Sequence, residues 1–215
     1  MMKNKKLIIS IILIIVAGIF FFLPKDSESP TIEINDPEVV INGVEINNQE
    51  GIVDVVKEEK KAPSLSREVE FPDNFPVEGY EPVTKKINEI VVFLKENPTS
   101  FDHWLELGIY RKMIEDYKGA ELVWDYASYL EPNKFVVWGN LADLYALYLK
   151  DNTKAEAYYL KALEVGPHQD YLYFKTAQFY MDYLENIEKA IEIVEKGIEM
   201  KPNSQQLKDL LKTLK

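Results

Sequence analysis

The sequence contains no cysteine and only two histidines among its 215 residues. The absence of cysteine excludes disulfide bonds, thiolate metal sites and thiol nucleophiles. The sequence also contains no glycine-rich phosphate loop, HExxH motif, nucleophile elbow or EF-hand loop. The two histidines fit non-catalytic roles, His103 in packing beside Trp104 or exposed to solvent, and His168 in a turn or cap after Pro167. We therefore expect no enzymatic activity, no cofactor and no metal ion.

Basic side chains are in the minority, because 25 Lys and Arg stand against 36 Asp and Glu and give a net charge of −11. This balance argues against nucleic acid as a partner, since duplex binding depends on pairing basic side chains with phosphates. The net charge is +3 over residues 1–23, −10 over residues 24–83 and −4 over residues 84–215. The excess negative charge therefore belongs mainly to the middle segment.

Residues 7–23, LIISIILIIVAGIFFFL, form a run of 17 residues without a charged side chain. A helix of this length spans about 25 Å, close to the lower limit for crossing a bilayer. Three lysines (Lys3, Lys5 and Lys6) precede the run, and basic residues favour the cytoplasmic side. We therefore predict a single-pass anchor in the cell membrane, Leu7–Leu23, with a cytoplasmic N-terminus and an extracytoplasmic C-terminal domain. A cleaved signal peptide, with a weak cleavage site at Ala17, is the alternative.

Residues 24–83 contain seven of the eleven prolines and most of the excess acidic charge, which is typical of a solvated linker. Within it, residues 39–46 place Asn42-Gly43 between β-branched runs, which is a strong signal for a β-hairpin. An isolated two-stranded hairpin is marginally stable in water, so a transient turn is an equal alternative.

The four remaining prolines recur at a nearly constant step. Pro98, Pro132, Pro167 and Pro202 are separated by 34, 35 and 35 residues. Other positions keep the same step, and the aligned sets are Trp104/Trp138/Tyr173, Leu107/Leu141/Thr176, Gly108/Ala142/Ala177, Ala120/Ala155/Ala190, Trp124/Tyr159/Val194 and Ala127/Ala162/Gly197. Internal periods of this length indicate stacked two-helix units.

The aligned positions also make sense as helix faces. Trp104, Leu107, Gly108 and Arg111 follow the spacing i, i+3, i+4, i+7 of one helical stripe. Small residues in such a stripe allow two helices to approach closely, and aromatic residues fill the space beside them. Three polar residues are placed to cap the second helix of each unit, namely Asp116, Asn152 and Asn186.

These residues resemble the tetratricopeptide repeat family. The resemblance rests on Trp104-x2-Leu107-Gly108…Ala120…Trp124…Ala127…Pro132, on Trp138-x2-Leu141-Ala142-x2-Tyr145…Ala155…Tyr159…Ala162…Pro167, and on a looser third unit from Tyr173 to Pro202. Arg111 departs from the family pattern, which usually has an aromatic residue there. Units two and three carry one extra residue, which we place in the turn between their helices.

The resemblance implies an all-α fold, a right-handed α-solenoid of about three helix-turn-helix repeats over residues 84–215. Flanking helices are expected over residues 83–96 and 204–215. In this family the first helices of the units line a concave groove that binds a protein or peptide. The corresponding residues here are Asp102, Leu105, Ile109, Lys112, Met113, Val136, Asn140, Asp143, Leu147, Tyr171, Phe174, Lys175 and Gln178.

One known subtype of this family binds a C-terminal carboxylate with two Asn and several Lys or Arg side chains. Only Asn140 and Lys175 fit that pattern here, so we do not expect a carboxylate clamp. The sequence leads to the hypothesis of a membrane-anchored scaffold that binds a partner protein in the groove of its repeats. The alternative is a self-associating structural component, or an accessory subunit of an envelope assembly, secretion or enzyme complex.

Overall fold

The computed structural model describes residues 40–41, 44–45 and 59–215, and the chain separates into two units, residues 1–58 and 59–215. The predicted membrane anchor, Leu7–Leu23, lies outside the described residues. Among the residues that are described, no helix is both long and apolar enough to cross a membrane.

In the first unit, strands β1 (Val40–Ile41) and β2 (Val44–Glu45) form an antiparallel pair. Val40 lies opposite Glu45, and Ile41 lies opposite Val44. This is the register of a hairpin with a two-residue connection. The pair falls within residues 39–46, for which the sequence was compatible with either a hairpin or a transient turn.

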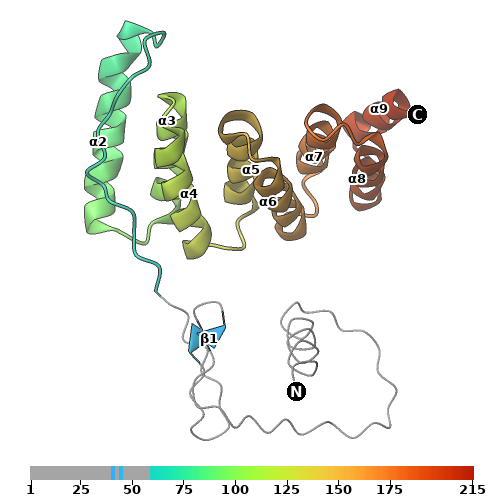
Figure 1. Cartoon of the computed structure of the whole chain (residues 1–215), viewed down its shortest axis with the longest axis horizontal. Coiled ribbons are helices and arrows are strands. Elements are labelled where there is room, and N and C mark those ends of the chain that lie inside the picture. Colours follow the sequence, from blue (N-terminus) through green and yellow to red (C-terminus); the bar gives the residue numbers. More distant parts are fainter. Residues whose placement is uncertain (1–39, 42–43, 46–58) are drawn as a thin grey trace, which may run out of the picture. The chain divides into compact units, whose positions relative to one another are not determined.

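The second unit is a row of antiparallel helices in sequence order (Figure 1). Its elements are the 3-10 helix η1 (Val77–Gly79), α2 (Tyr80–Glu96), α3 (Phe101–Met113), α4 (Tyr117–Leu130), α5 (Phe135–Leu144), the π-helical turn η2 (Tyr145–Leu149), α6 (Asn152–Val165), α7 (Asp170–Asp182), α8 (Ile187–Met200) and α9 (Gln205–Leu214). Helices α3 and α4, α5 and α6, and α7 and α8 pack as pairs, while α2 and α9 flank them. The structure thus confirms three helix-turn-helix units with flanking helices.

The predicted helix stripes form the core. In α3 the buried residues are Trp104, Leu107, Gly108 and Arg111, the four that the sequence pattern selected. A Cβ added to Gly108 would lie 2.1 Å from Nε1 of Trp124, whose ring fills the space above it. This contact explains why the position needs a small residue.

The second helices begin with side-chain caps that differ from the prediction in one unit. Asp116 accepts a hydrogen bond from the backbone N–H of Gly119, and Asn186 accepts one from Lys189. In unit two the cap is Asp151, which accepts from the N–H of Lys154, rather than Asn152. A carboxylate is as good a cap as an amide, so the sequence alone did not separate these neighbours.

The connection between α5 and α6, where we placed the extra residue of unit two, contains the π-helical turn η2. The N–H of Asp151 donates there to the carbonyl of Tyr145. A wider helical turn takes up one residue without lengthening the connection. As a result, Leu147 lies in the wide turn and is exposed.

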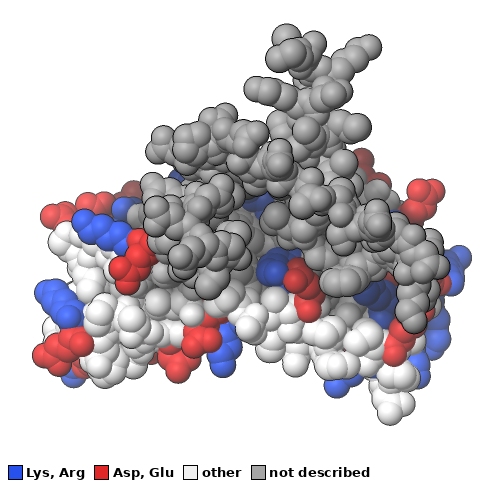
Figure 2. All heavy atoms as spheres, turned by 90° about the horizontal axis from the view of Figure 1, so that it is seen from below, with Lys and Arg blue, Asp and Glu red and all other residues white. Residues whose placement is uncertain are grey.

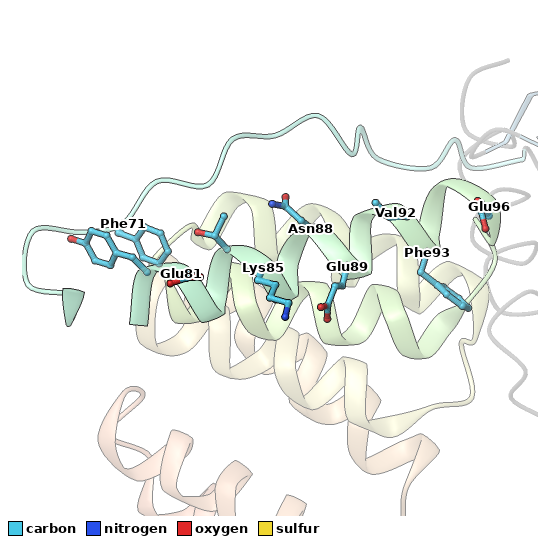
Figure 3. Close-up of a pocket in the computed structure, with 10 residues that line it drawn as sticks. Phe71, Glu81, Lys85, Asn88, Glu89, Val92, Phe93 and Glu96 are labelled. Atoms are coloured by element: carbon cyan, nitrogen blue, oxygen red, sulfur yellow. The ribbon is translucent and has the colours of Figure 1, made fainter. Parts of the chain in front are cut away.

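The helical unit begins earlier than the sequence predicted. The boundary expected at residue 84 lies instead at residue 59, because residues 59–76 pack along α2 as an irregular segment, which we call the N-terminal strap (Figures 1 and 3). Its apolar side chains against the core are Ala62, Leu65, Val69, Phe71 and Phe75. The high proline and acid content of residues 24–83 concealed these contacts.

We predict that Gly108→Ala destabilises the helical unit by about 1–3 kcal/mol, because the new methyl group overlaps the Trp124 ring. Gly139→Ala is the matched control in α5, since its nearest neighbour is the Leu172 side chain at 3.5 Å and alanine favours a helix interior. Urea unfolding measures both variants. Equal stability of the two would contradict the close helix contact.

Candidate partner-binding surface

The buried guanidinium of Arg111 holds the strap against the first repeat. It donates to the backbone carbonyl of Glu68 at 2.5 Å and to that of Arg67 at 2.6 Å. It also lies 3.3 Å from the carboxylate of Asp116. Since a buried guanidinium must be both paired and hydrogen-bonded, the strap supplies acceptors that α3 cannot provide itself.

Asp116 connects three parts of the structure through one carboxylate. Besides capping α4, it accepts hydrogen bonds from Nε and Nη2 of Arg67, each at 2.5 Å. Burial acts to raise the pKa of Asp116. The hydrogen bonds from Arg67 and Gly119 and the positive charges of Arg67 and Arg111 outweigh burial, so this pKa lies below its ordinary value. Asp116 is therefore ionised at neutral pH.

The position of Arg111 is occupied by tyrosine in the other two units. Tyr145 and Tyr180 occupy it there, and each hydroxyl donates to a glutamate of the preceding unit, Glu121 and Glu156 respectively. The residue 24 positions before Arg111 is Ile87 of α2, which offers no acceptor. The strap thus replaces, for unit one, the polar contact that a preceding repeat would make.

The thirteen predicted groove residues all remain at least partly accessible, and none belongs to the core. The exposed ones are Asp102, Ile109, Met113, Leu147, Tyr171 and Gln178; the half-buried ones are Leu105, Lys112, Val136, Asn140, Asp143, Phe174 and Lys175. They lie on the first helix of each unit, in α3, α5 with η2, and α7. All thirteen are thus accessible to solvent, and their role in binding stays a prediction.

Large apolar side chains are prominent on this face. Ile109, Met113, Leu147 and Tyr171 are each between 38% and 47% exposed. Exposed apolar side chains that recur on neighbouring elements mark interaction surfaces more often than scattered single ones do. The face is therefore suited to a partner with apolar side chains.

Three polar residues of the first helices interact with other parts of the protein, namely Asp143, Lys175 and Lys112. Asp143 of α5 accepts a hydrogen bond from the Tyr159 hydroxyl at 2.7 Å and forms an ion pair with Lys175 of α7. Lys112 lies over the ring of Trp124, with its Nζ 5.9 Å from the ring centroid. Lys175 is thus paired with Asp143 of the neighbouring unit.

A concavity of about 990 Å³ lies on the outer face of α2 (Figure 3). Its lining is mainly apolar, with Phe71, Tyr80, Val92 and Phe93, and four charged side chains also line it, namely Glu81, Lys85, Glu89 and Glu96. This concavity belongs to one flanking helix and the strap, whereas exposed apolar side chains recur on the first helices of all three units. The first helices are therefore the better candidate.

Within the described residues no metal centre competes with this candidate, and the face seen in Figure 2 shows no extended basic surface. Within the described ranges, no group of three or more His, Cys, Asp or Glu side chains could hold a metal ion. Where described residues are visible in Figure 2, basic and acidic side chains are interspersed. Such a surface does not favour duplex nucleic acid.

Comparisons with known proteins agree with the geometry. The family model described as "Tetratricopeptide repeat" matches residues 136–168 and 171–204, which span the helix pairs α5–α6 and α7–α8. These two segments therefore resemble tetratricopeptide repeats. The helix pair α3–α4 has the same arrangement but lies outside the matched residues.

Solved structures of tetratricopeptide-like fold resemble the chain at low identity. A "Crystal structure of MamA protein" aligns with a TM-score of 0.52 at 19% identity, over 64% of this chain and 74% of that chain. "MamA 41-end from Desulfovibrio magneticus RS-1" aligns with a TM-score of 0.50 at 19% identity, over 64% and 76%. At such identities the likeness concerns the fold alone. No curated protein sequence matched this chain.

The strap is the part of the helical unit that the sequence did not predict. One signal was available, because Arg111 stands where the repeats usually carry an aromatic side chain, and a basic residue in a buried stripe requires acceptors. A second signal was the spacing of Leu65, Val69 and Phe71 within a segment otherwise rich in charge. Neither signal indicates where the strap would pack.

The attachment of the strap should weaken in acid through Asp116. Because the pKa of Asp116 in the folded protein is below its ordinary value of 3.8, its contribution is present above that pH and is lost as the pH falls through the lower folded pKa. Asp116→Asn should cost on the order of 1–3 kcal/mol at pH 7, because Arg111 and Arg67 lose a charged acceptor.

Unfolding of the protein and of Asp116→Asn is to be measured side by side from pH 7 to pH 2. We expect the difference between them to shrink below pH 3.8. Asp182→Asn, at an exposed site on α7, serves as the control and should show no such difference. A difference that stays constant across the range would exclude a role for the Asp116 charge.

Proposed function

We propose that this protein is a membrane-anchored scaffold that binds a partner protein through the exposed face of its first helices, α3, α5 and α7. The observation that carries the proposal is the set of apolar side chains on this face, Ile109, Met113, Leu147 and Tyr171, which three successive units present to solvent. Aromatic and large aliphatic side chains supply most of the binding energy in protein interfaces. The proposed activity is binding, with no catalytic step.

The second helices also carry exposed apolar side chains and therefore supply a matched comparison for this face. Leu160 of α6 and Ile187 at the start of α8 are 42% and 44% exposed, similar to the groove residues. They belong to the opposite member of each helix pair. General surface hydrophobicity would therefore involve both sets, whereas groove binding involves only the first.

The double variant Ile109→Asp/Leu147→Asp should lose partner binding, because two charges would have to be desolvated in the interface. The matched control is Leu160→Asp/Ile187→Asp, which adds the same charges at residues of similar exposure. The full chain is cross-linked in its native membrane, purified and analysed for bound proteins. We expect adducts with the unmodified protein and the control, but not with the groove variant.

If Ile109→Asp/Leu147→Asp forms the same adducts as the unmodified protein, the proposed binding site is wrong. Loss of adducts in both double variants would show that surface hydrophobicity, rather than this face, governs association. Thermal unfolding of each variant verifies that a loss of binding does not reflect a loss of folding.

The proposed topology places the repeats outside the cytoplasm, anchored by Leu7–Leu23. The support is the apolar run itself and the lysines before it, which favour a cytoplasmic N-terminus. Protease added outside intact cells whose outer layers have been removed should digest the repeat domain. Protection of the C-terminus under these conditions, with digestion only after lysis, would reverse the topology.

A further inference from the structure

Asp143 is a fixed acceptor in the middle unit of the candidate surface. The Tyr159 hydroxyl of α6 donates to its Oδ1 at 2.7 Å, and Tyr159 is only 4% exposed. Burial, followed by the charge of Asp143 and this hydrogen bond, raises the pKa of Tyr159 far above its ordinary value. The hydroxyl therefore keeps its proton and holds the carboxylate in one orientation, with the other oxygen, Oδ2, turned to the neighbouring unit.

Lys175 of α7 occupies that other oxygen, but it is the less constrained partner of the pair. Its side chain is 43% exposed, whereas that of Asp143 is 16% exposed. A lysine side chain has four rotatable bonds and strong hydration, and ion pairs at such exposed sites contribute little. A second cation of better geometry can therefore take its place on Asp143 while Lys175 turns into solvent.

The surroundings of Asp143 favour a cation. Tyr171, at the start of α7, is 38% exposed, and its pKa is raised by burial and then by the charge of Asp143. Its ring meets that of Phe135 edge to face, with the centroids 6.4 Å apart. An aromatic ring beside a carboxylate attracts ammonium and guanidinium groups, and apolar side chains around it contact the aliphatic stem of such a residue.

An anionic group fits the same place poorly. A ligand carboxylate that bound Lys175 would approach the fixed charge of Asp143, so that one ammonium group would face two carboxylates. When a basic side chain of the partner replaces Lys175, the negative charge of Asp143 is still paired with a cation. The arrangement therefore discriminates between basic and acidic partner side chains.

We propose that Asp143, fixed by Tyr159 and flanked by Tyr171, receives a lysine or arginine side chain of the partner in place of Lys175. The inference rests on the proposed function of this face and adds the chemistry of the partner, a segment with apolar residues around one basic residue. Lys175 then acts as an intramolecular competitor for the ligand.

The role of Lys175 as a competitor can be tested directly. Removing its side chain should raise the affinity for the ligand, whereas removing a residue that contacts the ligand would lower it. Phage-displayed random 12-residue peptides are selected on the purified full chain, and the enriched peptides are synthesised. Affinities are then measured for the unmodified protein, Lys175→Ala, Asp143→Asn and the control Asp182→Asn.

We expect enriched peptides with Lys or Arg among apolar residues. Their affinity should rise about three-fold in Lys175→Ala, where the competitor is absent, and fall at least ten-fold in Asp143→Asn. The asparagine of that variant can still accept the Tyr159 hydrogen bond through its amide oxygen, so the variant isolates the charge. Replacing the peptide's basic residue by Gln should give a similar loss and little further loss in Asp143→Asn.

Other outcomes separate this inference from the proposed function. Peptides that require Ile109 and Leu147 but carry acidic residues, or whose affinity falls in Lys175→Ala, would overturn the basic-residue site alone. If none of the selected peptides loses affinity for Ile109→Asp/Leu147→Asp, the proposed binding face fails and this inference fails with it.

Discussion

The first repeat depends on the pairing of one buried guanidinium. Arg111 stands in the apolar stripe of α3, and its charge is compensated by Asp116 and by two carbonyl oxygens of the N-terminal strap. Burying such a charge without partners would cost several kcal/mol, so unit one and the strap are stable only together. In units two and three, Tyr145 and Tyr180 make the equivalent contact to a glutamate of the preceding unit. The position of Arg111, Tyr145 and Tyr180 thus links each unit to the element before it, which is the strap for unit one and the preceding unit for units two and three.

The strap does not cover the exposed residues of α3, α5 and α7. The strap lies along α2 and against Arg111, while the exposed residues of α3, α5 and α7 remain accessible. Stability comes from the contacts between the helices of each pair and between successive units, as in other repeat proteins. The exposed apolar residues are therefore not needed for folding, which is the condition for a surface to serve a partner.

The sequence predicted what is periodic and missed what occurs once. The 35-residue step identified the three helix pairs, the small residues opposite aromatic rings and the accessible face, because each is repeated and each follows helical spacing. The strap could not be predicted, since its contacts join residues more than 40 positions apart, as Arg67 and Asp116 do. The cap in unit two was displaced by one residue because Asp151 and Asn152 are chemically equivalent for that role. The Asp143–Tyr159–Lys175 cluster involves three helices, and its members were individually visible only as groove or core residues.

The central proposal is that the first helices, and not the second, contact the partner. Incorporation of a photo-cross-linking amino acid at Leu147 and, separately, at Leu160 in the native membrane tests this proposal directly, since the two side chains have similar exposure. We expect a defined adduct from position 147 and none from position 160. The same adducts from both positions, or an adduct from position 160 alone, would contradict it.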